Sequence, residues 1–193
     1  MKRQPARVLA PSDVDRLLQL AERRRYPLRN RVMVLLSFKA GLRACEIAGL
    51  TWPMVLMTSG RIADHISISG RIAKYGSARR IPVHRDLRAA LKRYHLASDK
   101  ELSGAVIRSE RDGPMTAKGV VNWFHHAYRE LQLEGCSSHS GRRTFITQSA
   151  RVVAKVGGSL RDVQELAGHR ALTTTERYIV GDREAQRRLI SLI

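Results

Sequence analysis

Residues 139–178 carry the stretch that decides the fold: HSGRRTFITQSARVVAKVGGSLRDVQELAGHRALTTTERY. Apolar residues recur there at helical spacing in three blocks, and they predict helices over 142–156, 160–167 and 174–179. Ser159 with Asp162, and Thr173 with Glu176, have the spacing of capping boxes that begin the second and the third helix. The segment therefore predicts three consecutive helices joined by tight turns.

The same stretch holds side chains that can act on a phosphate. His139 and Arg142 come at the start of the first helix, so both can point toward an anion bound at that helix N-terminus. His169 follows Gly168, which ends the second helix, and Tyr178 lies in the third. Each pair alone is weak evidence, because an exposed His–Arg pair or a half-buried tyrosine is common in helical proteins.

The residues before this stretch predict more helices and one small sheet. Ser12 with Asp15 resembles a capping box for a helix that Pro27 closes. Between residues 60 and 83, β-branched isoleucines punctuated by glycines predict two or three short antiparallel strands, with residues 74–78 at a hairpin tip. The chain is thus expected to be mainly α (α+β), with a small antiparallel β-sheet. Further helices are expected at about 30–40, 44–50, 85–96 and 117–131.

The charge balance narrows the class of function. The 193 residues include 35 Lys and Arg against 17 Asp and Glu, which gives a net charge of +18. A surplus of this size disfavours enzymes of cationic substrates and favours a polyanionic partner, most simply nucleic acid. Cys45 and Cys136 are too few and too far apart for a disulfide framework or a metal site, so we expect a reducing cytoplasm. No apolar stretch is long enough to predict a membrane span.

Basic residues also cluster around the predicted hairpin, at Arg71, Lys74, Arg79 and Arg80. One interpretation is a solvated basic face. The other is a ribbon that enters a DNA groove, since a two-stranded ribbon fits the major groove. Charge alone does not decide whether such a protein only binds DNA or also cuts it.

The motifs taken in order are more specific. Gly41-Leu42-Arg43-Ala44-Cys45-Glu46-Ile47, the hairpin lysine, His139-Ser140-Gly141-Arg142-Arg143-Thr144, and Leu166-Ala167-Gly168-His169 with Thr175 and Tyr178 resemble the catalytic domain of the tyrosine recombinases, the phage integrase family. The resemblance extends from about residue 9 to residue 179. It implies the helical catalytic fold of that family and site-specific cleavage and rejoining of DNA.

By this resemblance, Tyr178 attacks the scissile phosphate and forms a 3′-phosphotyrosyl bond. Arg43 and Arg142 hold the phosphate, His139 is the candidate general base, and Lys74 is the candidate general acid for the leaving 5′-oxygen. The second histidine, His169, is expected to hydrogen-bond a phosphate oxygen, and Glu46 to orient its neighbours. The family's chemistry uses no cofactor, neither ATP nor Mg²⁺, because the phosphotyrosyl ester stores the bond energy.

Some positions depart from the family pattern. Leu is usual where Gly141 stands, and His is common where Arg143 stands, while the Asp that often follows the tryptophan is missing from Thr51-Trp52-Pro53-Met54. We expect Gly141 to loosen the placement of Arg142. The expected DNA contacts are Arg71, Arg79, Arg80 and Arg143.

The resemblance also divides the chain. Residues 1–10 form a basic lead-in, residues 11–180 the recombinase catalytic domain, and residues 181–193 a tail. Most family members carry a core-binding domain before the catalytic one, and a short form lacking it is expected here. The apolar end of the tail either folds back onto its own core or docks on a neighbouring protomer. Double-stranded DNA and further copies of the chain are the expected partners, as a tetramer on DNA and a monomer or weak dimer when free, with no membrane contact and a cytoplasmic, nucleoid-associated location.

Two other functions remain open at this point. The chain can be a DNA-binding accessory protein whose nucleophile no longer works, although retention of every catalytic group argues against that. It can also be a strand relaxer like the type IB topoisomerases, which use the same chemistry. The His169 box and its spacing to Tyr178 resemble recombinases more.

Overall fold

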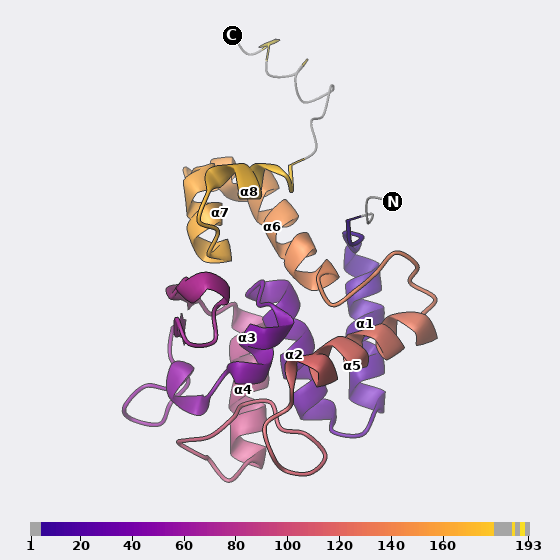
Figure 1. Ribbon diagram of the computed structural model, residues 1–193, viewed down its shortest axis with the longest axis vertical. Coiled ribbons are helices and arrows are strands. Elements are labelled where there is room, and N and C mark those ends of the chain that lie inside the picture. The colour runs from indigo at the N-terminus through magenta and orange to yellow at the C-terminus, as the bar shows by residue number, and fades with distance from the viewer. Residues whose placement is uncertain (1–4, 180–186, 188–189, 192–193) are drawn as a thin grey trace.

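The computed structural model describes residues 5–179, 187, 190 and 191, and of Lys74 the backbone. The chain is mostly helical with one two-stranded sheet, so the predicted fold class is confirmed. Figure 1 shows α1–α5 gathered in one body, with α7 and α8 to one side of it and α6 running between them. The helices are α1 (Pro11–Arg23), α2 (Pro27–Lys39), α3 (Ala44–Gly49), α4 (Arg85–Ala97), α5 (Ala117–Glu130), α6 (Ser140–Val152), α7 (Leu160–Ala167) and α8 (Leu172–Glu176). Short 3₁₀ turns are η1 (Trp52–Met54), η2 (Lys74–Gly76) and η3 (Val153–Val156), and the strands are β1 (His65–Ile68) and β2 (Arg79–Pro82).

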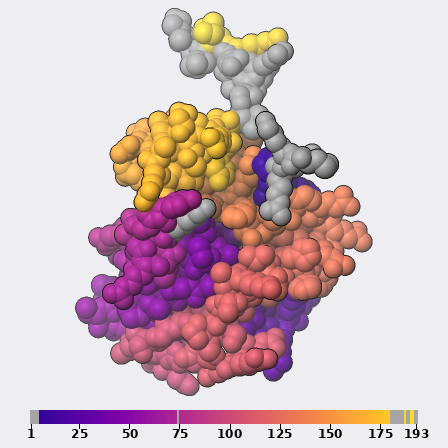
Figure 2. All heavy atoms as spheres, in the orientation of Figure 1, coloured from indigo at the N-terminus to yellow at the C-terminus, as the bar shows by residue number. Residues whose placement is uncertain are grey.

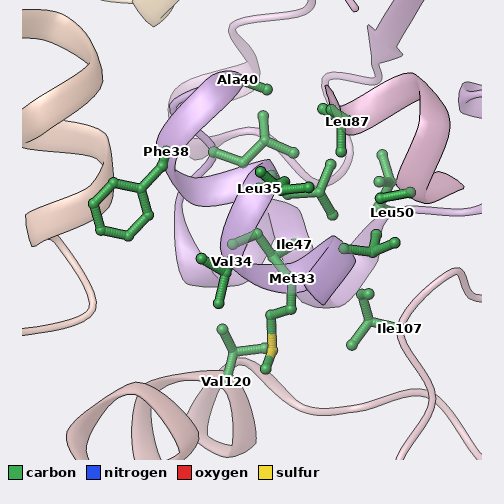
Figure 3. Close-up of a cluster of buried hydrophobic side chains, with 14 of the residues drawn as sticks. Met33, Val34, Leu35, Phe38, Ala40, Ile47, Leu50, Leu87, Ile107 and Val120 are labelled. Atoms are coloured by element: carbon green, nitrogen blue, oxygen red, sulfur yellow. The ribbon is translucent and has the colours of Figure 1, made fainter. Parts of the chain in front are cut away.

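The α2 helix is the centre of the larger body. Its residues from Val32 to Leu36 are all buried, so the helix is apolar around its whole circumference and needs neighbours on every side. It packs against α1, α3, α4 and α6. Figure 3 shows Met33 of α2 lying toward Val120 of α5, with Leu50 and Ile107 nearby. This helix therefore anchors the elements that carry the site.

The sheet is a short antiparallel hairpin. Ile66 pairs with Ile81, and both are buried, while Arg80 on the outer face is exposed. The alternation along each strand fits a ribbon with one face on the core. The segment between the strands contains η2, at the position where the hairpin tip was predicted.

A second, smaller core lies under the last helices. Ile146 of α6 meets Val163 and Ala167 of α7, and these three side chains are buried. Phe145, Val153, Leu160 and Tyr178 pack around them. The C-terminal helices thus have a small core of their own, and Leu166 of α7 also packs against the main core.

Several predicted boundaries shift for reasons that the backbone explains. Pro27 does not close the first helix but begins α2, because its missing N–H costs nothing at the first helical position. The Ser12 and Thr173 capping boxes are wrong, since α1 begins after Ala10 and α8 after Ala171, neither with a side-chain cap. The Ser159 box is confirmed, with both of its hydrogen bonds formed.

The described residues contain no helix long and apolar enough to cross a membrane. Cys45 and Cys136 are both free thiols, the first exposed and the second half-buried.

Candidate active site

Arg43 is placed by a tight turn between α2 and α3. Gly41 has φ +63°, and a Cβ there would lie 2.4 Å from the ring of Phe145, so both the backbone and the packing require glycine. Arg43 then caps α3: its backbone N–H donates to Glu46 Oε2 at 2.8 Å, and its Nη1 donates to Glu46 Oε1 at 3.2 Å. Its side chain remains 17% exposed. Arg43 is therefore held from one side and open on another.

Glu46 is the anionic centre of this arrangement. Its side chain is 0% exposed, and Arg79 of β2 binds it through Nη1 at 2.8 Å and Nη2 at 3.0 Å. Burial raises the pKa of Glu46, but the hydrogen bonds and charges of Arg79 and Arg43 outweigh it and hold that pKa below its ordinary value. Glu46 is thus ionised at neutral pH. It binds two arginines, Arg43 and Arg79.

Arg142 is buried at the start of α6, with 3% of its surface exposed. Its Nη1 donates to the carbonyl of Gly41 at 2.8 Å, and its Nη2 donates to the carbonyl of Ala167 at 2.6 Å. Burial first, and then the charge of Arg43, lower the pKa of Arg142 to about 10, so it stays a cation at pH 7. Arg142 therefore joins the Arg43 turn to the end of α7.

His169 receives the other hydrogen bond of Arg142. Arg142 Nη2 lies 3.0 Å from His169 Nε2, and His169 Nδ1 lies 2.9 Å from Thr175 Oγ1. A guanidinium only donates, so Nε2 accepts and the ring proton sits on Nδ1, facing Thr175. Burial and then the charges of Arg142, Arg43 and Arg79 lower the pKa of His169 to about 4. His169 is a neutral ring that holds Arg142 in place.

Tyr178 lies directly against this histidine. The two rings stack with centroids 5.6 Å apart and an interplanar angle of 24°. The guanidinium of Arg143 sits 5.5 Å from the centroid of the Tyr178 ring, within reach of a cation–π contact. Thr147 donates to the Tyr178 carbonyl at 3.2 Å. The structure thus brings the predicted nucleophile, His169 and Arg142 into one cluster.

The remaining predicted residues lie at the start of α6 and on the hairpin. His139 precedes α6 as its N-cap residue, is exposed, and has its backbone N–H on Ser137 Oγ. Lys74 begins η2 on the hairpin, and its side chain lies outside the described residues. Arg71 and Arg80 are exposed on the same hairpin.

The structure corrects two expectations from the sequence. Arg79 is not an exposed DNA contact: its side chain is 5% exposed and bound to Glu46. Gly141 does not loosen Arg142, because α6 approaches α2 so closely there that a Cβ would lie 2.1 Å from Ser37 Oγ. The glycine permits the close packing that buries Arg142.

Sequence reasoning missed the positioning part of the site. Thr175 is fully buried and accepts the Nδ1 proton of His169, and Arg79 completes the shell of Glu46. In the sequence, Thr175 stands out only as part of a motif. The alternation of β2, which places Arg79 and Arg80 on opposite faces, is the signal that separates their roles.

A groove of about 850 Å³ opens beside the cluster, between β2 and α7. Its lining includes Arg80 and Pro82 from the strand, Asp162 and Glu165 from the helix, and His169. In Figure 2 the magenta surface of the hairpin meets the yellow surface of α7 along this boundary. The cluster is therefore reachable from solvent beside the hairpin.

Comparison with known proteins shows the family of the chain. A model described as "Phage integrase family" matches residues 7–184. The chain belongs to the phage integrase family. Its sequence is 29% identical over 174 residues to tyrosine recombinase XerC of Xylella fastidiosa strain 9a5c, covering 89% of this chain and 55% of that protein. XerC of Roseiflexus castenholzii is also 29% identical, over 181 residues, with 89% and 54% covered.

Solved structures of the family share the fold. The Tn1549 transposon integrase in complex with transposon right end DNA matches with a TM-score of 0.73 and 18% identity, covering 100% of this chain and 67% of that one. The XerH recombinase bound to its difH substrate matches with a TM-score of 0.72 and 18% identity, covering 98% and 55%. This phage integrase chain spans about half the length of the curated relatives it matches.

Proposed function

We propose that this protein is a site-specific DNA recombinase that cleaves and rejoins DNA through a 3′-phosphotyrosyl bond. The observation that carries the proposal is the contact chain from Tyr178 to His169 and from His169 to Arg142. A hydroxyl nucleophile beside a buried guanidinium suits attack on a phosphodiester, because the cation stabilises the charge that develops on the phosphate oxygens.

The charges of the cluster fit that reaction. Arg43, Arg79 and Arg142 surround the single carboxylate of Glu46, which leaves a surplus of positive charge next to Tyr178. A phosphodiester carries one negative charge, and attack by a phenolate adds a second in the transition state. The surplus therefore stabilises the transition state more than the bound DNA, which is the condition for catalysis.

The protons need an acceptor and a donor. A free tyrosine has a pKa near 10, so Tyr178 needs a base at neutral pH, and His139 is our candidate. Lys74 is our candidate acid for the leaving 5′-oxygen, because it lies on the hairpin beside the groove. We assign His169 to holding Arg142, since its Nε2 accepts from that arginine; a direct bond from His169 to phosphate would need the proton on Nε2.

The substrate and assembly follow from charge and from the relatives. The net charge of +18 suits double-stranded DNA, and structures of the Tn1549 integrase and XerH contain DNA. A lambda integrase dimer bound to a core site has a TM-score of 0.67 and 19% identity, covering 92% of this chain and 49% of that one. We therefore propose that copies of this chain assemble on DNA, in the cytoplasm at the nucleoid. Most of the tail, residues 181–193, lies outside the described residues.

Covalent capture tests the proposal. A nick in the cleaved strand, a few nucleotides 3′ of the cleavage point, lets the short fragment that carries the free 5′-hydroxyl diffuse away and so traps the phosphotyrosine. We therefore expect an SDS-resistant complex of wild-type protein with a nicked duplex library of randomised centre. Tyr178→Phe should abolish that complex and leave DNA binding intact. Undiminished complex with Tyr178→Phe would show that another residue is the nucleophile.

The same material separates the alternative functions. An accessory protein would bind the library and give no covalent complex. A strand relaxer would change the linking number of a plasmid without exchanging strands between two sites. We expect exchange, and no effect of EDTA on capture.

A further inference from the structure

We propose that Arg79 is a positioning residue of this reaction: it shares the buried carboxylate of Glu46 with Arg43, and this sharing keeps Arg43 available to the DNA phosphate. The inference rests on the proposed function. It starts from contacts that join β2, α3 and α7, three elements that are far apart in the sequence.

The carboxylate of Glu46 is saturated with donors. Oε1 accepts from Nη1 of Arg79 at 2.8 Å and Nη1 of Arg43 at 3.2 Å, and Oε2 accepts from Nη2 of Arg79 at 3.0 Å and the backbone N–H of Arg43 at 2.8 Å. A carboxylate offers about four acceptor sites. With Arg79 taking one site on each oxygen, Glu46 can engage Arg43 through only one guanidinium nitrogen.

Removal of Arg79 changes this division. A fully buried carboxylate that loses a bidentate partner keeps its charge only by drawing in another donor, and Arg43 is the nearest cation. Its guanidinium would then turn to face Glu46 with two nitrogens, as Arg79 does now. Arg43 would be less able to face the phosphate, so cleavage would slow although neither Arg43 nor Tyr178 has changed.

Arg79 itself is fixed for this task. Its Nε donates to the carbonyl of Leu166 at 2.9 Å, next to the Ala167 carbonyl that Arg142 binds. A Cβ at Gly168 would lie 3.0 Å from Arg79 Cδ and 3.0 Å from its Nη1, so the side chain has no room to swing toward α7. Because it is 5% exposed, a DNA phosphate could reach its guanidinium only by displacing Glu46. These contacts separate Arg79 from an ordinary DNA-binding arginine.

The test is a double-mutant cycle between Arg79→Met and Glu46→Gln, measured as the single-turnover rate of covalent capture with the nicked duplex library at saturating protein. We expect Arg79→Met to slow capture by about 100-fold, since a misplacement of about 1 Å costs that much. Glu46→Gln should slow it less. The double variant should be faster than Arg79→Met alone, because a neutral glutamine no longer captures Arg43.

The pH profile gives a second readout. Without Arg79, one of the two arginines that lower the pKa of Glu46 is gone while its burial remains, so the pKa of its carboxyl rises. Capture by Arg79→Met should therefore recover relative to wild type as the pH is lowered through that raised pKa, and the double variant should show no such recovery. A purely structural defect would not give this pH dependence of the capture rate.

A control is the exposed ion pair of Arg88 with Asp64, which is also an arginine–carboxylate pair but does not involve Glu46. Arg88→Met and Asp64→Asn should have small, additive effects on capture. If Arg79→Met fails to fold, as thermal melting would show, Arg79→Lys replaces it in the same cycle, with a smaller defect and the same rescue by Glu46→Gln.

Additive losses in the Arg79–Glu46 cycle, or a wild-type rate with Arg79→Met, would overturn the inference while leaving the proposed function standing. Absence of any covalent complex with wild-type protein would overturn both.

Discussion

Gly141→Ala is a sharp test of how the site is built, because the structure gives the collision that it would cause. The new Cβ would lie 2.1 Å from Ser37 Oγ, 2.9 Å from Ser37 Cβ and 3.0 Å from Phe38 Cδ2. All three atoms belong to α2, whose residues from Val32 to Phe38 are all buried, so this part of the helix has little room to move away. The start of α6 must therefore move outward, and Arg142 with it.

Overpacking of a core contact typically costs about 1–3 kcal/mol. In a domain of this size each kcal/mol lowers the melting temperature by about 2–4 °C, so Gly141→Ala should lower it by about 2–12 °C. Displacement of Arg142 should also slow covalent capture by about 100-fold. Thermal melting followed by circular dichroism and single-turnover capture measure the two effects.

Ser37→Ala supplies the matched control. Ser37 Oγ is buried and has no hydrogen-bond partner among the described residues, so its removal should cost little. In the double variant the closest collision is gone, and part of the lost stability and rate should return. Wild-type melting and capture with Gly141→Ala would refute the account of the close approach between α6 and α2.

Three more predictions follow from the charges and the chemistry. Lys74→Ala should cleave normal DNA slowly but should cleave at close to the wild-type rate when sulfur replaces the bridging 5′-oxygen, because a thiolate leaves without a proton. Arg43→Ala should stay slow on both substrates. Equal slowness of Lys74→Ala on the two substrates would mean that another residue is the general acid. Affinity for DNA should fall by about 10³–10⁵-fold between about 50 and 200 mM salt if about 6–10 phosphates are contacted, and a flat response in a filter-binding titration would contradict a phosphate-tracking surface. Finally, the pKa of His169 is lowered to about 4 in the folded chain, so near pH 6.5 the unfolded chain binds a proton that the folded chain does not. The free energy of unfolding should therefore fall as the pH drops from about 6.5 toward about 4. Urea titrations of His169→Asn should lack the part of this fall that His169 causes.

Much of the fold could be predicted because local sequence patterns determine it. The 160–167 helix and its Ser159 cap were predictable since the capping residues contact only their own turn. The boxes at Ser12 and Thr173 failed because the same spacing also occurs where the chain has already begun to coil. Spacing alone does not show which residue is the N-cap of the helix.

The site was predictable only in part, for the same reason. The residues carrying the expected chemistry form motifs, but their supports are tertiary. Arg79 of β2 binds Glu46 of α3 and the Leu166 carbonyl of α7. The tight fit at Gly141 depends on Ser37, which no local pattern connects to it. Charge therefore suggested that Arg79 binds DNA, whereas packing makes it the partner of a buried carboxylate.

The small core beneath the last helices affects the order in which parts of this protein unfold. Tyr178 rests on a cluster with three buried members, while α2 is enclosed by the main body of the molecule. Regions with little buried apolar surface open at lower free energy than the global unfolding transition. We therefore expect Tyr178 to detach together with α7 and α8 while α2 remains folded. In native-state hydrogen exchange, amide protons of α7 and α8 should exchange as one early unit, well before those of α2.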